Sequence, residues 1–200
     1  MYKRQEYQRG LEWNKEKWLY QDFTGVPDLE VMLLLSNGRT NEAQVLVESF
    51  RGRIEGIVKE FPFDYRRARE ADYVQGIFDL EQGNYSSAIE CLLRAISLLP
   101  AQSMPFGPYS KSVDSFRAAF MWHLAEAYRR SGDLSKAQEE YEKISGLTTG
   151  RLWWGDLYAK SFYMLGKIAE QKGWPGKAIE HYEKFLEVWK DADPDIPEIE

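Results

Sequence analysis

The chain has 200 residues, of which 44% are hydrophobic and 29% are charged, and its formal net charge is −6. This is the composition of a folded protein, and its acidic balance argues against a nucleic-acid partner, because phosphate binding needs clustered Lys and Arg. The single cysteine, Cys91, excludes an intramolecular disulfide and favours a reducing, cytoplasmic compartment. No apolar run approaches the roughly 18 residues of a membrane span.

The two ends of the chain differ from the rest. Residues 1–5 resemble the translation of a sequencing tag, so we exclude them from fold reasoning. Residues 6–23 carry aromatic and charged side chains at a spacing that predicts one amphipathic helix. Residues 193–200 have the prolines and acids of a first helical turn, but no helix body follows. We therefore expect a fragment of a longer reading frame that ends at the start of a C-terminal capping helix.

Between these ends, the apolar periodicity predicts four pairs of helices. Within the first pair, Gly52 and Gly56 weaken the long second helix. All eight prolines fall at predicted boundaries, where their missing N–H is tolerated. The predicted pairs are 29–35 with 41–61, 65–82 with 85–99, 113–131 with 134–145, and 151–172 with 175–190.

A glycine followed five residues later by an alanine recurs four times, where chance would give about one such pair. This pattern predicts a repeated unit of helix, glycine turn and helix. Two antiparallel helices approach closely only where facing side chains are short, and Gly76, Ala125 and Gly166 each precede a turn glycine by seven residues. The four pairs are Gly38 with Ala43, Gly83 with Ala88, Gly132 with Ala137, and Gly173 with Ala178.

These features resemble the tetratricopeptide-repeat family, with units near 24–57, 69–102, 118–151 and 159–192 inside an array over 24–192. The second unit carries the signature at Gly76, Gly83, Tyr85, Ala88, Ala95 and Pro100, whereas the first matches only at Gly38 and Ala43. Successive turn glycines lie 45, 49 and 41 residues apart, more than the family's repeat of about 34. The resemblance implies an all-α, right-handed superhelical solenoid of antiparallel helix pairs. It also implies a non-catalytic module that binds a peptide or partner protein in its concave groove.

A weaker likeness concerns residues 185–194, which are similar to the repeat regions that end bacterial serine/threonine kinases and multidomain signalling regulators. It implies a bacterial protein with a further domain upstream, and the present residues would then be the regulatory C-terminal tail of a signalling enzyme. A second alternative is an envelope assembly repeat protein, which an upstream signal sequence with a lipid-modified cysteine would reveal. The identity of the partner and the oligomeric state are left open.

The resemblance also implies which side chains face a partner, because the first helix of each pair lines the concave side in this family. An aromatic residue recurs at one groove position of three units, with charged residues one to two turns away. Aromatic anchors beside cations suit an acidic or carboxylate-bearing peptide. The same side chains are equally compatible with packing against neighbouring helices. The predicted partner-binding residues are Tyr73, Trp122, Glu126, Arg129, Arg130, Lys160, Tyr163 and Lys167.

The sequence offers no constellation of nucleophile, base and electrophile. His123 and His181 lie on predicted helices without a third metal ligand nearby in sequence. Cys91 lies between apolar residues on a core-facing helix and is interpreted as a small buried hydrophobe. We therefore predict no enzyme activity, no cofactor and no metal within these residues.

Overall fold

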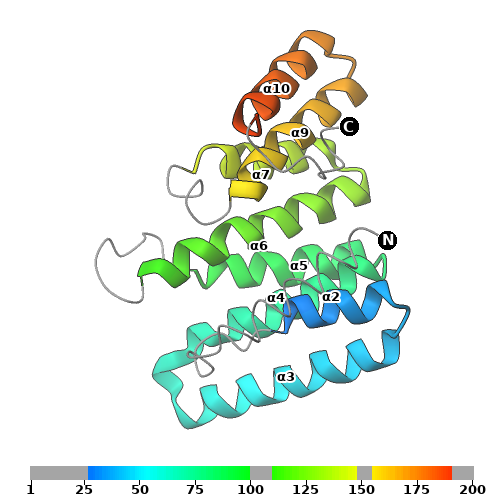
Figure 1. The fold of residues 1–200 in the computed structure, drawn as a ribbon. Coiled ribbons are helices and arrows are strands. Elements are labelled where there is room, and N and C mark those ends of the chain that lie inside the picture. The colour runs from blue at the N-terminus through cyan, green and yellow to red at the C-terminus, as the bar shows by residue number, and fades with distance from the viewer. Residues whose placement is uncertain (1–26, 100–109, 148–154, 191–200) are drawn as a thin grey trace. The chain divides into compact units, whose positions relative to one another are not determined.

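The computed structural model describes residues 27–99, 110–147 and 155–190, and these residues form helices and short turns without a β-strand (Figure 1). The predicted all-α class is therefore confirmed. The chain divides into two units, residues 1–99 and 100–200. The expectations for residues 1–5, for the helix over 6–23 and for the start of a capping helix over 193–200 lie outside the described residues.

The first unit contains two pairs of helices. Helices α2 (Asp28–Ser36) and α3 (Thr40–Glu60) form the first pair, and α4 (Ala68–Glu81) and α5 (Tyr85–Ser97) form the second. Helix α4 packs on α5 as well as on α2 and α3. The core of this first unit contains a cluster of buried side chains from α2, α3 and α4, which are Val31, Ala43, Val47, Phe50, Ile54, Ala71 and Val74.

The connection between α3 and α4 differs from the prediction. The sequence predicts one helix over 65–82, but Pro62–Arg67 form a six-residue 3-10 helix, η1, and the α-helix begins only at Ala68. Asp64 interrupts regular geometry with φ −95° and ψ 24°, and Pro62 has no N–H to donate within a helix. The chain therefore reaches α4 through a tight, exposed connector.

The second unit also contains two pairs. Helices α6 (Ser110–Ser131) and α7 (Leu134–Ser145) form one, and α9 (Gly155–Gln171) and α10 (Pro175–Val188) form the other. Helix α9 packs on α10, on α7 and, over a smaller area, on α6. The predicted pairing is therefore found in both units, with the ends of the observed helices within a few residues of those expected.

The four predicted glycine turns have one geometry. Gly38, Gly83, Gly132 and Gly173 have φ of 72°, 79°, 92° and 73°, and no other described residue type has a positive φ. In each turn the N–H after the glycine donates to the carbonyl five residues earlier, for example from Asn84 to Asp79 at 2.8 Å. This is the Schellman arrangement, which needs a left-handed residue and therefore favours glycine.

Two other glycines permit the close approach of paired helices. A Cβ built on Gly76 would lie 2.7 Å from Cγ of Leu92, and one built on Gly166 would lie 2.4 Å from Cε1 of Tyr182. Both distances are far below van der Waals contact. The small residues of the sequence pattern therefore lie where α4 meets α5 and where α9 meets α10.

Gly52 and Gly56 in α3 have open space around them, since a Cβ built on either meets no atom within 4 Å. We expect the double replacement Gly52→Ala with Gly56→Ala to stabilise the first unit by about 1–2 kcal/mol, since alanine restricts the unfolded chain and favours helix. Urea unfolding measures the change. A loss of stability would show that α3 is packed differently from the structure described.

Candidate functional site

Tyr73 on α4 is the one predicted groove residue of the first unit, and its placement argues against that role. Only 1% of its surface is exposed, so its ring is part of the core. The alternative interpretation, packing against neighbouring helices, describes this side chain better. A partner cannot reach Tyr73 in this conformation, and the candidate surface is therefore restricted to the second unit.

Glu126 on α6 is buried as well, with 8% of its surface exposed. Its carboxylate accepts hydrogen bonds from Nη2 and Nε of Arg129 at 2.8 and 3.0 Å and from the hydroxyl of Tyr141 on α7. Nε of Arg130 lies 3.4 Å from the same carboxylate. These contacts satisfy a charge that would be costly to bury alone.

The electrostatics of this buried group follow from its contacts. Burial acts to raise the pKa of Glu126, but the hydrogen bonds from Arg129 and Tyr141 and the charges of both arginines outweigh it and lower the pKa. Burial, followed by the adjacent Glu126 charge, raises the pKa of the Tyr141 phenol. Glu126 is therefore an ionised internal group that joins α6 to α7, not an exposed contact for a partner.

Trp122 lies one turn before Glu126 and remains half-buried. Its ring packs edge to face on Tyr141, with ring centroids 5.3 Å apart and an interplanar angle of 69°. Arg129 and Arg130 also keep partial exposure, although both face Glu126. Thus α6 presents a partly exposed indole that packs on Tyr141 and two guanidinium groups that are held by the buried Glu126.

Lys160, Tyr163 and Lys167 follow one another along α9 at helical spacing. The Tyr163 ring lies 5.8 Å from the ring of Tyr182 and 5.5 Å from that of Phe185, both on α10. Nζ of Lys167 lies 5.4 Å from the Tyr163 ring centroid, within range of a cation–π interaction.

The aromatic contacts continue along α10 to its C-cap. The rings of Phe185 and Trp189 lie 5.0 Å apart, and Nζ of Lys160 lies 5.9 Å from the Trp189 ring. The hydroxyl of Tyr182 donates to Glu170 at 2.7 Å. We call these four rings, Tyr163, Tyr182, Phe185 and Trp189, the α9–α10 aromatic cluster; Lys160 and Lys167 lie against its two ends.

Sequence reasoning missed the three members of this cluster on α10. Their signal was present, because residues 182, 185 and 189 are spaced so that they share one face of a helix. The cluster also adjoins a hollow of about 380 Å³ whose lining includes Trp189, together with Gly155, Tyr158, Lys184, Glu187 and Val188. Lys184 and Glu187 form an ion pair of 2.6 Å there, so the hollow carries both charges.

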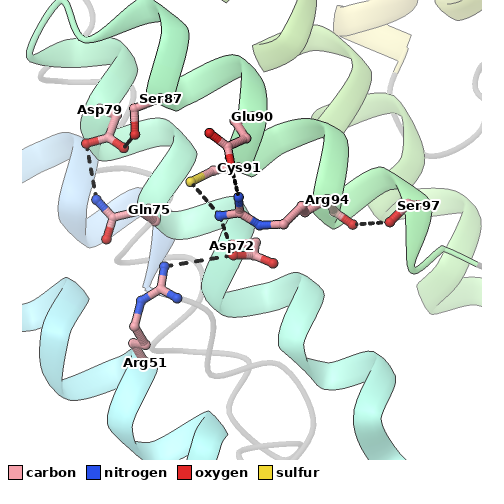
Figure 2. A network of polar contacts seen from close by, with 9 residues as sticks. All are labelled: Arg51, Asp72, Gln75, Asp79, Ser87, Glu90, Cys91, Arg94 and Ser97. Carbon is pink, nitrogen blue, oxygen red and sulfur yellow. Dashed lines mark hydrogen bonds and ion pairs between the residues drawn. The ribbon is translucent and has the colours of Figure 1, made fainter.

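The first unit holds a polar network that joins α3, α4 and α5 (Figure 2). Asp72 lies 3.2 Å from Nη2 of Arg94 and 3.9 Å from Nη2 of Arg51. Arg94 also donates to Glu90 at 2.8 Å and contacts Sγ of Cys91 at 3.2 Å. Each acid of the network faces a donor, so this arrangement supports packing rather than chemistry.

Cys91 lacks the surroundings of a reactive thiol, and His123 is bonded to its own helix. Cys91 is buried, and burial raises the pKa of its thiol, which disfavours the nucleophilic thiolate. Nδ1 of His123 is bonded to the carbonyl of Ala119 on its own helix at 2.9 Å. Across the described ranges, no three His, Cys, Asp or Glu side chains gather as a metal site. Of the helices described, none is long and apolar enough to cross a membrane.

Two comparisons bear on the architecture. A family model described as "Tetratricopeptide repeat" matches residues 118–148 and 159–188, which include α7, α10 and most of α6 and α9. Tetratricopeptide repeat protein 36 of Mus musculus is 27% identical over 139 residues, which is 70% of this chain and 63% of that protein. The chain therefore spans less than two thirds of the length of this relative.

Proposed function

We propose that the second unit, in which residues 118–148 and 159–188 match the tetratricopeptide repeat, is a non-catalytic binding module for a peptide or a segment of a partner protein. The α9–α10 aromatic cluster with Lys160 and Lys167 at its ends is the observation that carries this proposal. The rings of Tyr163, Tyr182 and Trp189 keep partial exposure and offer rigid apolar area that loses little conformational entropy on binding. Phe185 is buried and supports these rings from within the helix pair. The two lysines favour acidic residues in the partner.

The proposed contact surface includes only part of the residues expected from the sequence. Lys160, Tyr163 and Lys167 supply it on α9, and Trp122, Arg129 and Arg130 extend it on α6. Glu126 has a supporting role in this proposal, because its carboxylate fixes the guanidinium groups of Arg129 and Arg130. A preformed arrangement of this kind lowers the cost of ordering side chains on binding.

The broader context of the module stays a prediction. The bacterial signalling tail and the envelope assembly protein both remain alternatives, and the matched relative is a mouse protein, which favours neither. The absence of catalysis, the cytoplasmic location and the exclusion of nucleic acid rest on the sequence arguments given above. The buried carboxylates of Asp72, Asp79 and Glu126 each accept a hydrogen bond from a side chain.

Substitution of the two lysines tests the proposal. Peptides that combine aromatic residues with Asp and Glu are expected to bind the chain more tightly than the same peptides with Asn and Gln. We expect the double variant Lys160→Gln with Lys167→Gln to weaken binding of the acidic series by about tenfold or more, since both charges lie beside the proposed contact area. Fluorescence anisotropy with labelled peptides measures the dissociation constants.

The matched control is Arg39→Gln with Lys136→Gln, which removes the same charge from exposed ion pairs at the starts of α3 and α7. It should leave affinity within a factor of about two after correction for the change in net charge. Circular dichroism checks that all variants keep their helix content. Equal binding of the acidic and amide series, or equal loss in both double variants, would overturn the proposed site.

A further inference from the structure

The connector η1 exposes three aromatic side chains within five residues. Phe61, Phe63 and Tyr65 are 43%, 82% and 51% exposed, and Phe63 is the most exposed large hydrophobic residue in the described part of the chain. The Phe61 and Phe63 rings touch edge to face at 6.0 Å. Single exposed apolar residues are ordinary, but a contiguous aromatic group at one tip indicates contact with another surface.

The sequence around these rings carries a basic excess in a chain that is acidic overall. Residues 51–70 carry six Lys or Arg against four Asp or Glu, whereas the whole chain has a net charge of −6. Arg66 stacks on Tyr65 at 5.8 Å from the ring centroid, and Lys59 lies exposed in the last turn of α3. Two ion pairs in this stretch, Asp64 with Arg67 at 2.5 Å and Glu70 with Arg69 at 3.6 Å, each cancel one acid and one base and leave the basic excess unchanged.

The position of the three rings favours contact with a lipid bilayer over insertion into a pocket of a partner protein. The connector lies at the end of the α3–α4 pair, where the chain turns back (Figure 1). A hollow of about 300 Å³ lies between the same two helices, and its lining includes Lys59 and Ala68 but none of the three rings. Rings that project from a helix end, with cations at their base, match the headgroup region of a bilayer, where aromatic side chains are enriched and Lys or Arg meets phosphate.

We propose that the η1 connector is a peripheral docking site for an anionic lipid surface. Phe61 and Phe63 enter the boundary between headgroups and acyl chains, and Lys59 and Arg66 lie against the lipid phosphates. The first unit would then attach the chain reversibly to a membrane while the second unit remains available to a partner. This site is separate from the peptide surface proposed above and does not depend on it.

An environment-sensitive fluorophore on Phe63→Cys tests the docking directly, because Cys91, the remaining cysteine, is buried. The probes are vesicles of phosphatidylcholine alone and vesicles with about 30% phosphatidylserine. The label should gain intensity and shift to the blue with the anionic vesicles, and about tenfold more lipid should be needed without phosphatidylserine. The same label on Val45→Cys is the matched control, since Val45 is 65% exposed on α3 but lies far along the helix from η1.

Unlabelled variants separate the contribution of the aromatic rings from that of the basic side chains. Phe61→Ser with Phe63→Ser is expected to abolish co-sedimentation with both kinds of vesicle. Lys59→Gln with Arg66→Gln should remove the preference for anionic lipid and its sensitivity to salt. A label at position 63 that does not respond to vesicles, or that responds as the label at position 45 does, overturns the proposal. A response at position 63 to acidic peptides alone would assign the connector to a protein partner instead.

Discussion

Replacing Gly166 with alanine is expected to destabilise the α9–α10 pair by about 1–3 kcal/mol. The added Cβ would lie 2.4, 2.7 and 2.8 Å from three ring carbons of Tyr182. That ring cannot move without cost, because its hydroxyl is bonded to Glu170 and its face contacts Tyr163. Hydrogen–deuterium exchange of α9 and α10 measures the effect and distinguishes it from changes in the first unit.

The first unit offers the same experiment at Gly76. Its added Cβ would meet Cγ of Leu92 at 2.7 Å, and Leu92 is fully buried, so Gly76→Ala should open α4 and α5 to exchange. Gly56→Ala is the matched control, because the same chemical change occurs in a helix with open space around it. Protection of α9–α10 unaffected by Gly166→Ala would contradict the proposed reason for the small residues.

Replacing Glu126 with glutamine is expected to destabilise the second unit by about 1.5–3 kcal/mol at neutral pH, since it weakens charge-assisted hydrogen bonds to buried partners. The folded protein lowers the pKa of Glu126 below its ordinary 4.5. Its stabilising contribution is therefore present above the unfolded-state pKa and is lost as the pH falls through the lower, folded-state value. The stability difference between wild type and Glu126→Gln should accordingly vanish in acid.

Thermal unfolding between pH 7 and pH 3 measures this difference. Glu139→Gln removes one acid from an exposed position of the neighbouring helix α7 and is the matched control. It should change stability by no more than about 0.5 kcal/mol at any pH. A destabilisation by Glu126→Gln that stays constant down to pH 3 would show that ionisation of Glu126 is not what stabilises the second unit.

The architecture could be predicted from the sequence because its determinants are local. A glycine that must adopt a positive φ and an alanine five residues later identify each turn and the start of the next helix, as Gly83 and Ala88 illustrate. The exception is η1, where a 3-10 segment replaces the expected first turns of α4. Helical periodicity cannot distinguish these two forms over six residues.

The candidate site was less predictable, because its residues act through contacts between helices. Family positions pointed to α6 and α9, where the proposed surface lies, but they also assigned Tyr73 and Glu126 to a surface although both are buried. The ion pairs of Glu126 with Arg129 and Arg130 follow helical spacing, but its partner on α7 is Tyr141, fifteen residues away, and no spacing rule within one helix reveals that contact. The rings at 182, 185 and 189 were accessible to sequence reasoning through their helical spacing.

The close approach of α9 and α10 sets the positions of the rings in the aromatic cluster. Because Gly166 has no side chain, α9 and α10 approach closely and the Tyr182 ring lies over the glycine. Tyr163 then packs on Tyr182. In the proposed function, Lys160 and Lys167 then flank a surface whose geometry is set before a partner binds. Preorganisation of this kind is what a binding module needs in order to convert contact area into affinity.

The most direct test of this account is a titration of isotope-labelled protein with an acidic, aromatic-containing peptide, followed by NMR of backbone amides and aromatic side chains. The account predicts that the largest shift changes fall on α9 and α10 around Tyr163, Tyr182 and Trp189, with smaller changes near Trp122 on α6. Shift changes that spread evenly over both units, or that leave these rings unaffected at saturation, would contradict it.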